Sequence, residues 1–190
     1  MTQPESQTAT PPPTIRRVFG LIGVTLGLLA LDQLSKFWAV TVLAGKPPTT
    51  YFGIVQLTYA QNHGGWGSLG AQWSDTARNI ALQFFPSARL LAMTVYAFRY
   101  SMAWQKAYGI AVLVSGGVGN LIDRVRFDHV IDFLYVGYGP VGTNIFNIAD
   151  MAILTGVGLL LYASWKEGDP VEKGKEGEIP ALPQDGAPSH

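Results

Sequence analysis

The chain has 190 residues, and its 13 basic and 13 acidic side chains leave no formal net charge, so nucleic acid is not expected as a partner. The absence of cysteine excludes disulfides, thiolate metal sites and cysteine nucleophiles. The 3 histidines are far apart in sequence and form no HExxH pair, so a metalloprotease site is not expected.

The first predicted helix follows a short polar lead-in. Residues 1–15 are polar and proline-rich, which predicts a disordered N-terminus. The apolar stretch 18–43 is long enough to cross a membrane, which takes roughly 20 residues. Arg16 and Arg17 in front of it also fit a secretory or twin-arginine signal. A removable leader would not explain the three further apolar stretches, so a membrane anchor is favoured.

The segment 45–79, between the first two predicted helices, has the residue pattern of a short β-strand. Tyr51, Val55, Leu57 and Tyr59 recur at alternating positions in a run rich in β-branched and aromatic residues. This pattern predicts a small β-containing segment at the bilayer surface. Ser74 and Asp75, near the end of the segment, are typical of the N-cap of the helix that follows.

Three further apolar stretches complete a predicted set of four transmembrane helices, and they cover 80–98, 107–124 and 144–165. The third is short, so its polar end is expected at an interface. Residues 168–190, rich in Gly, Pro and charge, are predicted to be a disordered tail. The fold class expected is an all-α integral membrane protein.

The distribution of Lys and Arg predicts the orientation, because cytoplasmic loops carry the excess. With both termini in the cytoplasm, basic residues near the helix ends are more numerous inside than outside. Those inside are Arg16, Arg17, Arg99, Lys106, Lys166, Lys173 and Lys175, and those outside are Lys46, Arg78 and Arg126.

Polar residues inside the predicted helices collect at one depth. Asp32 lies about 14 residues after Val18, roughly 21 Å from the cytoplasmic end of its helix. The other polar residues of this set lie where the third helix ends, in the loop that follows and where the fourth begins: Asn120, Asp123, Arg124, Asp132, Asn147 and Asp150. Ionisable groups in membrane helices are costly, so a cluster near the outer surface indicates function.

Some of these charges have a structural interpretation. Asp32 and Lys36 form an i, i+4 pair, and Asp123 beside Arg124 is also a candidate for a neutralised pair that holds helices together. Asp132 and Asp150 have no lysine or arginine within four positions. Two close, desolvated carboxylates share one proton, which is the arrangement of aspartic proteases.

Alternatives to this chemistry come from other residues and other classes of protein. Ser35 and Lys36 resemble a serine–lysine dyad, but adjacent helical residues point about 100° apart. The segment around Asn62 and Gly64 is either a substrate-binding loop or a plain surface turn. A small proton-coupled transporter or channel, which would spread its carboxylates across the membrane, and a non-catalytic membrane scaffold remain alternative functions.

Five motifs over residues 18–165 resemble, in order and spacing, the signature blocks of the lipoprotein signal peptidase (signal peptidase II) family. These motifs are Asp32-Gln33-Leu34-Ser35-Lys36, Asn62-x-Gly64, Gly116-Gly117-Val118-Gly119-Asn120-Leu121-Ile122-Asp123-Arg124, Val130-Ile131-Asp132-Phe133 and Phe146-Asn147-Ile148-Ala149-Asp150. One block departs from the family pattern, since Gly65, Trp66 and Gly67 stand where two alanines and a phenylalanine are usual.

The resemblance implies a four-helix aspartyl endopeptidase over residues 16–167. It would lie in the bacterial inner membrane and act near the extracytoplasmic face as a monomer without metal or other cofactor. Its partners would be membrane lipids and diacylglyceryl-modified prolipoproteins, cleaved just before the lipidated cysteine. Asp132 and Asp150 match the catalytic dyad, and the expected supporting residues are Asp32, Lys36, Asn62, Gly64, Asn120, Asp123, Arg124 and Asn147.

Overall fold

The structure is a computed structural model that describes residues 14–64, 72–100 and 102–167. The predicted disordered tail and all but the last two residues of the predicted N-terminal lead-in lie outside this part of the chain. The departure at Gly65, Trp66 and Gly67 also lies outside it.

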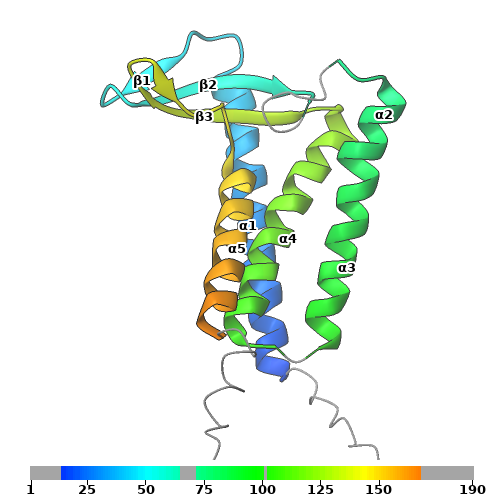
Figure 1. The fold of residues 1–190 in the computed structure, drawn as a ribbon. Coiled ribbons are helices and arrows are strands. Elements are labelled where there is room, and N and C mark those ends of the chain that lie inside the picture. Colours follow the sequence, from blue (N-terminus) through cyan, green and yellow to red (C-terminus); the bar gives the residue numbers. More distant parts are fainter. Residues whose placement is uncertain (1–13, 65–71, 101, 168–190) are drawn as a thin grey trace, which may run out of the picture.

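Long helical rods that run side by side make up most of the described chain (Figure 1). One rod is continuous through a short π-helix, η2, which joins α2 to α3. The bounds are α1 Ile15–Val42, α2 Asp75–Asn79, η2 Ile80–Phe84, α3 Phe85–Arg99, α4 Trp104–Phe127 and α5 Ile148–Glu167. Ser74 is the N-cap of α2, where its hydroxyl accepts a hydrogen bond from the Ala77 N–H at 3.3 Å, as its sequence position predicts.

Among the described residues, three helical stretches are long and apolar enough to cross a membrane: Ile15–Val42, Thr76–Arg99 and Ile148–Lys166. The helix α4 has 24 residues but is not one of them. Its glycines add little apolar character, and Asn120, Asp123 and Arg124 at one end are polar. By length alone α4 could cross a membrane, because a helix rises about 1.5 Å per residue.

The helix α4 packs against α1, α3 and α5, and two of its glycines allow a close approach. A Cβ at Gly116 would collide with the backbone carbonyl oxygen of Ala149 at the start of α5. A Cβ at Gly119 would lie 2.5 Å from the Asp32 Oδ2 atom of α1. Small residues are what membrane helices use to approach one another in this way.

An antiparallel sheet covers one end of the helices (Figure 1), and its strands lie in the order β1-β2-β3-β4. The strands are β1 Thr49–Tyr51, β2 Val55–Asn62, β3 Val130–Tyr138 and β4 Val141–Gly142. The first two form the predicted β segment between the first two helical rods. The other two come from the connection between α4 and α5, where no strand was predicted. The sequence lacks the alternating pattern of a strand here, because both faces of the first part of β3 are buried. The buried residues are Val130, Ile131, Asp132 and Phe133.

The exposure of α1 is the reverse of that in a soluble protein. Leu34 and Phe37 are 67% and 68% exposed, whereas Asp32 and Lys36 are 1% and 2% exposed. Charged side chains are almost never fully buried in soluble proteins unless paired, and large apolar surfaces are seldom left open to water. Lipid around the helices accounts for both observations.

Candidate active site

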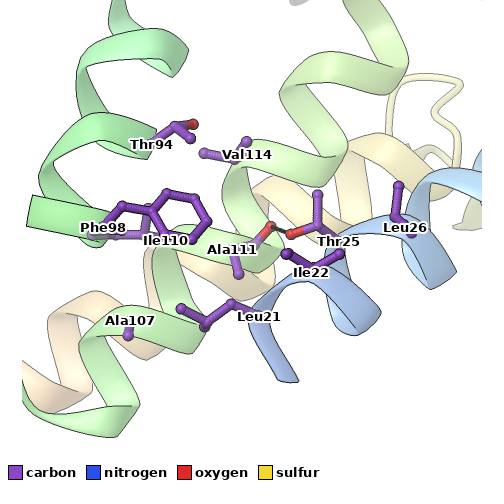
Figure 2. A pocket seen from close by; sticks show the side chains of 11 residues that line it. Leu21, Ile22, Thr25, Leu26, Thr94, Phe98, Ala107, Ile110, Ala111 and Val114 are labelled. Carbon is purple, nitrogen blue, oxygen red and sulfur yellow. Dashed lines mark hydrogen bonds between the residues drawn. The ribbon is translucent and has the colours of Figure 1, made fainter. Parts of the chain in front are cut away.

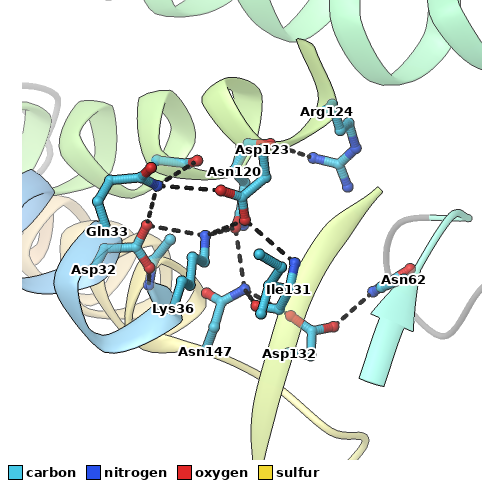
Figure 3. A network of polar contacts seen from close by, with 12 residues as sticks. Asp32, Gln33, Lys36, Asn62, Asn120, Asp123, Arg124, Ile131, Asp132 and Asn147 are labelled. Carbon is cyan, nitrogen blue, oxygen red and sulfur yellow. Dashed lines mark hydrogen bonds and ion pairs between the residues drawn. The ribbon is translucent and has the colours of Figure 1, made fainter. Parts of the chain in front are cut away.

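A buried network of polar side chains lies where the helices meet the sheet (Figure 3). At its centre the ammonium group of Lys36 contacts Asp32 Oδ2 at 2.9 Å, Asp123 Oδ2 at 2.8 Å and Asn120 Oδ1 at 3.0 Å. An ammonium group has three donors, so each of them has an acceptor. Lys36 therefore joins α1 to α4 through its ion pair with Asp123 and its hydrogen bond to Asn120, while its ion pair with Asp32 lies within α1.

Gln33, one position after Asp32, is part of the same network although sequence analysis did not single it out. Its Nε2 group lies 3.1 Å from Asp32 Oδ2, 3.3 Å from the Gly119 carbonyl oxygen and 3.2 Å from Asp123 Oδ1. The signal that could have identified it is its place in the polar run Asp32-Gln33 within an otherwise apolar helix. The neighbouring Ser35 hydroxyl donates to the Asp32 carbonyl oxygen at 2.7 Å, so Ser35 and Lys36 are not arranged as a dyad.

Asp123 pairs with Lys36, whereas its position in the sequence suggests a pair with the adjacent Arg124. Its Oδ2 atom also accepts a hydrogen bond from the Ile131 N–H at 3.2 Å, which ties the start of β3 to α4. The Arg124 Nη1 group donates to the Asn120 carbonyl oxygen at 3.4 Å, and its charge acts on Asp150, Asp132 and Asp123. Figure 3 shows its guanidinium group to one side of the network.

Asp132 lies in β3, and two side-chain amides hold its carboxylate. Asn62 Nδ2 of β2 donates to Asp132 Oδ2 at 3.0 Å, and Asn147 Nδ2 donates to Asp132 Oδ1 at 2.6 Å. The Asn62 amide is itself oriented by the Gly64 N–H, which donates to Asn62 Oδ1 at 3.2 Å. Sheet pairing of Ala60 with Asp132 brings Asn62 into reach, because Asn62 lies two residues further along β2 on the same face.

The Asp132 carboxyl is held towards its neutral form. Burial raises its pKa from the ordinary value of 3.8 to about 6, and the charge of Asp150 acts in the same direction. The hydrogen bonds from Asn62 and Asn147 and the charge of Lys36 oppose this rise. A carboxyl in this state can keep a proton close to neutral pH and donate it.

Asp150 lies in the first turn of α5 and is hydrogen-bonded by α4 and by its own helix terminus. Asn120 Nδ2 donates to Asp150 Oδ1 at 2.8 Å, and the Asn147 N–H donates to Asp150 Oδ2 at 3.2 Å. In return the Asp150 N–H donates to Asn147 Oδ1 at 2.9 Å, which is the reciprocal pattern of a capping box. The partial positive charge at a helix N-terminus stabilises a carboxylate in this position.

One residue, Asn147, connects Asp132 and Asp150, the predicted catalytic pair. Its side chain is fully buried and donates to Asp132, while its backbone N–H donates to Asp150. Asp32 fixes the adjacent turn, because its Oδ1 atom accepts a hydrogen bond from the Ala149 N–H at 2.9 Å. The structure therefore brings Asp132 and Asp150 together with seven of the predicted supporting residues, and Arg124 lies beside them.

Comparison with known proteins identifies the family of the chain. A family model described as "Signal peptidase (SPase) II" matches residues 24–166. The chain belongs to the signal peptidase II family. A lipoprotein signal peptidase of Streptococcus pyogenes serotype M1 is 40% identical over an alignment of 151 residues that covers 75% of this chain and 90% of that protein. The serotype M6 protein of the same name is 39% identical over the same lengths.

Two solved structures share the fold of this chain. One, titled "Bacterial membrane enzyme structure by the in meso method at 2.3 A resolution", has a TM-score of 0.70 at 22% identity and covers 86% of this chain and 96% of its own. A second with the same kind of title has a TM-score of 0.67 at 24% identity and covers 80% and 96%. Every predicted site residue lies within the part matched by the signal peptidase II model.

Proposed function

We propose that this signal peptidase II family member is an aspartic endopeptidase that removes signal peptides from diacylglyceryl-modified prolipoproteins. Asp132 and Asp150 would be its catalytic pair. The observation that carries the proposal is the connection of both carboxylates through Asn147, in a buried polar network at one end of the helices. Burial also raises the pKa of Asp132, so this carboxyl can hold a proton while Asp150 is ionised, as aspartic-protease chemistry requires.

In the proposed mechanism, Asp150 takes a proton from a water molecule as the water oxygen attacks the scissile carbonyl carbon. The proton held by Asp132 passes to the carbonyl oxygen, so the tetrahedral intermediate carries no full negative charge. Collapse of the intermediate breaks the C–N bond, and the proton taken by Asp150 goes to the leaving amine. The Asp132 carboxylate recovers its proton from the new acid group, so one water is consumed and the pair returns to its starting state.

The proposed topology has four membrane helices, with both termini in the cytoplasm and the site near the extracytoplasmic surface of the bacterial inner membrane. Figure 1 supports it, since the first residues of α1 and the last of α5 lie at the end opposite the sheet. The excess of basic residues at that end also agrees with cytoplasmic exposure. The protein is proposed to act as a monomer.

Because the chain has no cysteine, single-cysteine variants provide a direct test of the topology. A membrane-impermeant maleimide added to intact spheroplasts should label Lys46→Cys, which lies on the sheet side of α1. Labelling of Lys166→Cys, near the end of α5, should occur only after the membrane is broken. The opposite pattern would reverse the orientation, and equal labelling of both would contradict four crossings.

The function is tested with the detergent-purified protein and a synthetic peptide that contains a lipobox cysteine. The matched substrate is the same peptide without the diacylglyceryl group. We expect cleavage of the lipidated peptide just before the cysteine, located by mass spectrometry, and at least about tenfold slower cleavage of the unmodified one, the size of a change of 1.4 kcal/mol in the barrier. Absence of cleavage by well-folded protein would contradict the proposal.

The transporter alternative is not favoured, because the relatives at about 40% identity are named as peptidases.

Replacement of Asn62 by alanine should shift the pH dependence of cleavage to higher pH. The Asn62 amide stabilises the charged form of Asp132, so its loss raises the pKa of the Asp132 carboxyl further. The proton of the pair is then retained to higher pH, and the basic limb of kcat/KM moves in the alkaline direction.

The matched control for this shift is Gln61→Ala. Gln61 precedes Asn62 on β2, is exposed and donates to the Tyr59 hydroxyl at 3.0 Å. Its removal should leave the basic limb where it is in the wild type. A shift to lower pH in Asn62→Ala, or the same shift in both variants, would remove Asn62 from the proposed electrostatic role.

A further inference from the structure

An apolar cavity of about 200 Å³ lies between α1, α3 and α4, and the catalytic proposal does not use it. Figure 2 shows side chains from all three helices directed into it. Those that define its walls are Leu21, Ile22 and Leu26 of α1, Phe98 of α3, and Ile110 and Val114 of α4. They come from the first half of α1, the later turns of α3 and the first half of α4, so the cavity lies in the half of the helices away from the polar network.

The cavity is suited to hydrocarbon rather than to a polar ligand. The Thr25 hydroxyl in its wall is directed to the Ala111 carbonyl oxygen at 3.5 Å, and the Thr94 hydroxyl donates to the Leu90 carbonyl oxygen at 2.7 Å. The hydrogens of both hydroxyls are thus directed to backbone oxygens. Ile22 and Leu26 are 40% and 59% exposed, so the rim of the cavity reaches the outer surface of the helices. A chain in the surrounding lipid could enter there.

Arg17 supplies a charge next to this apolar cavity. It precedes Leu21 by four residues in α1, so both side chains lie on one face of the helix, one turn apart. The Nε and Nη2 atoms of Arg17 are buried, and no atom of the described residues accepts a hydrogen bond from either. Arg17 as a whole is partly buried, but two buried guanidinium nitrogens without an acceptor are costly, and a phosphate group is an acceptor of matching geometry.

The start of α1 favours an anion as well. Thr14 is its N-cap but forms no side-chain cap hydrogen bond, and the first turn contains no acidic residue. The partial positive charge of a 28-residue helix is therefore not compensated by a side chain of its own first turn. Phosphate groups bind readily at such positions.

We propose that this cavity binds one acyl chain of a phospholipid whose anionic headgroup is held by Arg17. The inference goes beyond the peptidase activity. The proposed topology enters it in one respect: it places the bound lipid in the cytoplasmic leaflet. The hydrophobic part of a signal peptide is the competing occupant. Signal peptides begin with a positively charged segment that would meet Arg16 and Arg17 at this end, so charge favours an anionic lipid.

The test measures lipid retention by native mass spectrometry of the delipidated full-length protein with phosphatidylglycerol or phosphatidylcholine added. Wild type should bind one phosphatidylglycerol at least about tenfold more tightly than phosphatidylcholine, a factor that corresponds to 1.4 kcal/mol. Arg17→Gln should lose this preference and Arg17→Lys should retain part of it. The control is Arg16→Gln, since Arg16 is exposed and on a different face, and it should bind as wild type does.

A second pair of variants tests the cavity itself. Ile22→Trp fills the exposed rim and should weaken binding of either lipid, whereas Phe19→Trp, at an exposed position not in the cavity wall, should not. Equal affinity for the two lipids, or full retention by Arg17→Gln, would overturn the proposal. Photocrosslinking of a signal peptide to residue 22 in preference to lipid would also overturn it. None of these readouts requires peptidase activity, so failure of the proposed function would be seen separately.

Discussion

Asp132→Asn and Asp150→Asn should each lower the rate of lipobox peptide cleavage by at least about 10³-fold, within the range expected for a lost acid–base group. An asparagine in place of Asp132 cannot give a proton to the carbonyl oxygen, and one in place of Asp150 cannot take a proton from water. Single-turnover cleavage of the diacylglyceryl-modified peptide is the measurement, because it reports the chemical step without product release.

Both variants should remain folded. Each carboxylate accepts two hydrogen bonds from asparagine residues, and an amide oxygen can still accept one of them. The lost bond costs about 1 kcal/mol, which a stable membrane protein tolerates. A thermal melt in detergent close to that of the wild type would show that loss of activity is chemical. Activity above about a tenth of wild type in either folded variant would remove that residue from the catalytic pair.

Asp128→Asn is the matched control for these two substitutions. Asp128 follows α4 in the left-handed backbone region with a φ of 61°, where asparagine is well tolerated. Its side chain is 56% exposed and pairs with Arg78 at 2.8 Å. A surface pair contributes about 0–1 kcal/mol, so activity and stability should stay near those of the wild type.

The sequence predicts the helices and the place of the polar cluster along them, because the length of an apolar stretch and the spacing of its polar residues are local properties of the chain. Apolar stretches of about 20 residues identify helices long enough to cross the bilayer. The stretch 80–98 lies within the helical stretch Thr76–Arg99, which starts earlier because Ser74 caps a polar first turn. The i, i+4 spacing of Asp32 and Lys36 identified a pair that the structure contains at 2.9 Å.

What could not be predicted depends on contacts between distant segments. The first four residues of β3 show no alternation because they are covered on both faces, so the sequence indicates a connection around Asp132 rather than a strand. The pairing of Lys36 with Asp123 spans α1 and α4, and sequence proximity suggested Arg124 instead. The role of Asn147 as a common partner of both carboxylates appears only when β3 and α5 are in place.

Lys36→Met should destabilise the protein by about 3–5 kcal/mol, the cost of leaving buried carboxylates without their counterion. Methionine matches the length of the lysine stem, so the loss is of charge rather than of volume. Asp32 and Asp123 are each about 1% exposed and would share the site without a cation. Unfolding by heat or by SDS in mixed micelles measures the effect. The control is Lys46→Met, which removes an exposed lysine beyond α1 and should change stability little.

The triple variant Asp32→Asn/Lys36→Met/Asp123→Asn separates the cost of unpaired charge from the value of the network. Removal of all three charges leaves no ion unpaired, so stability should recover towards that of the wild type. Activity should not recover to the same extent, because Asp32 fixes the turn of α5 through the Ala149 N–H and Asp123 fixes the start of β3 through the Ile131 N–H. These contacts set the positions of Asp150 and Asp132, and an amide oxygen accepts more weakly than a carboxylate. Full recovery of both properties would show that the ion cluster acts only as a structural element, whereas stable protein with slow cleavage would assign it to the positioning of the catalytic pair.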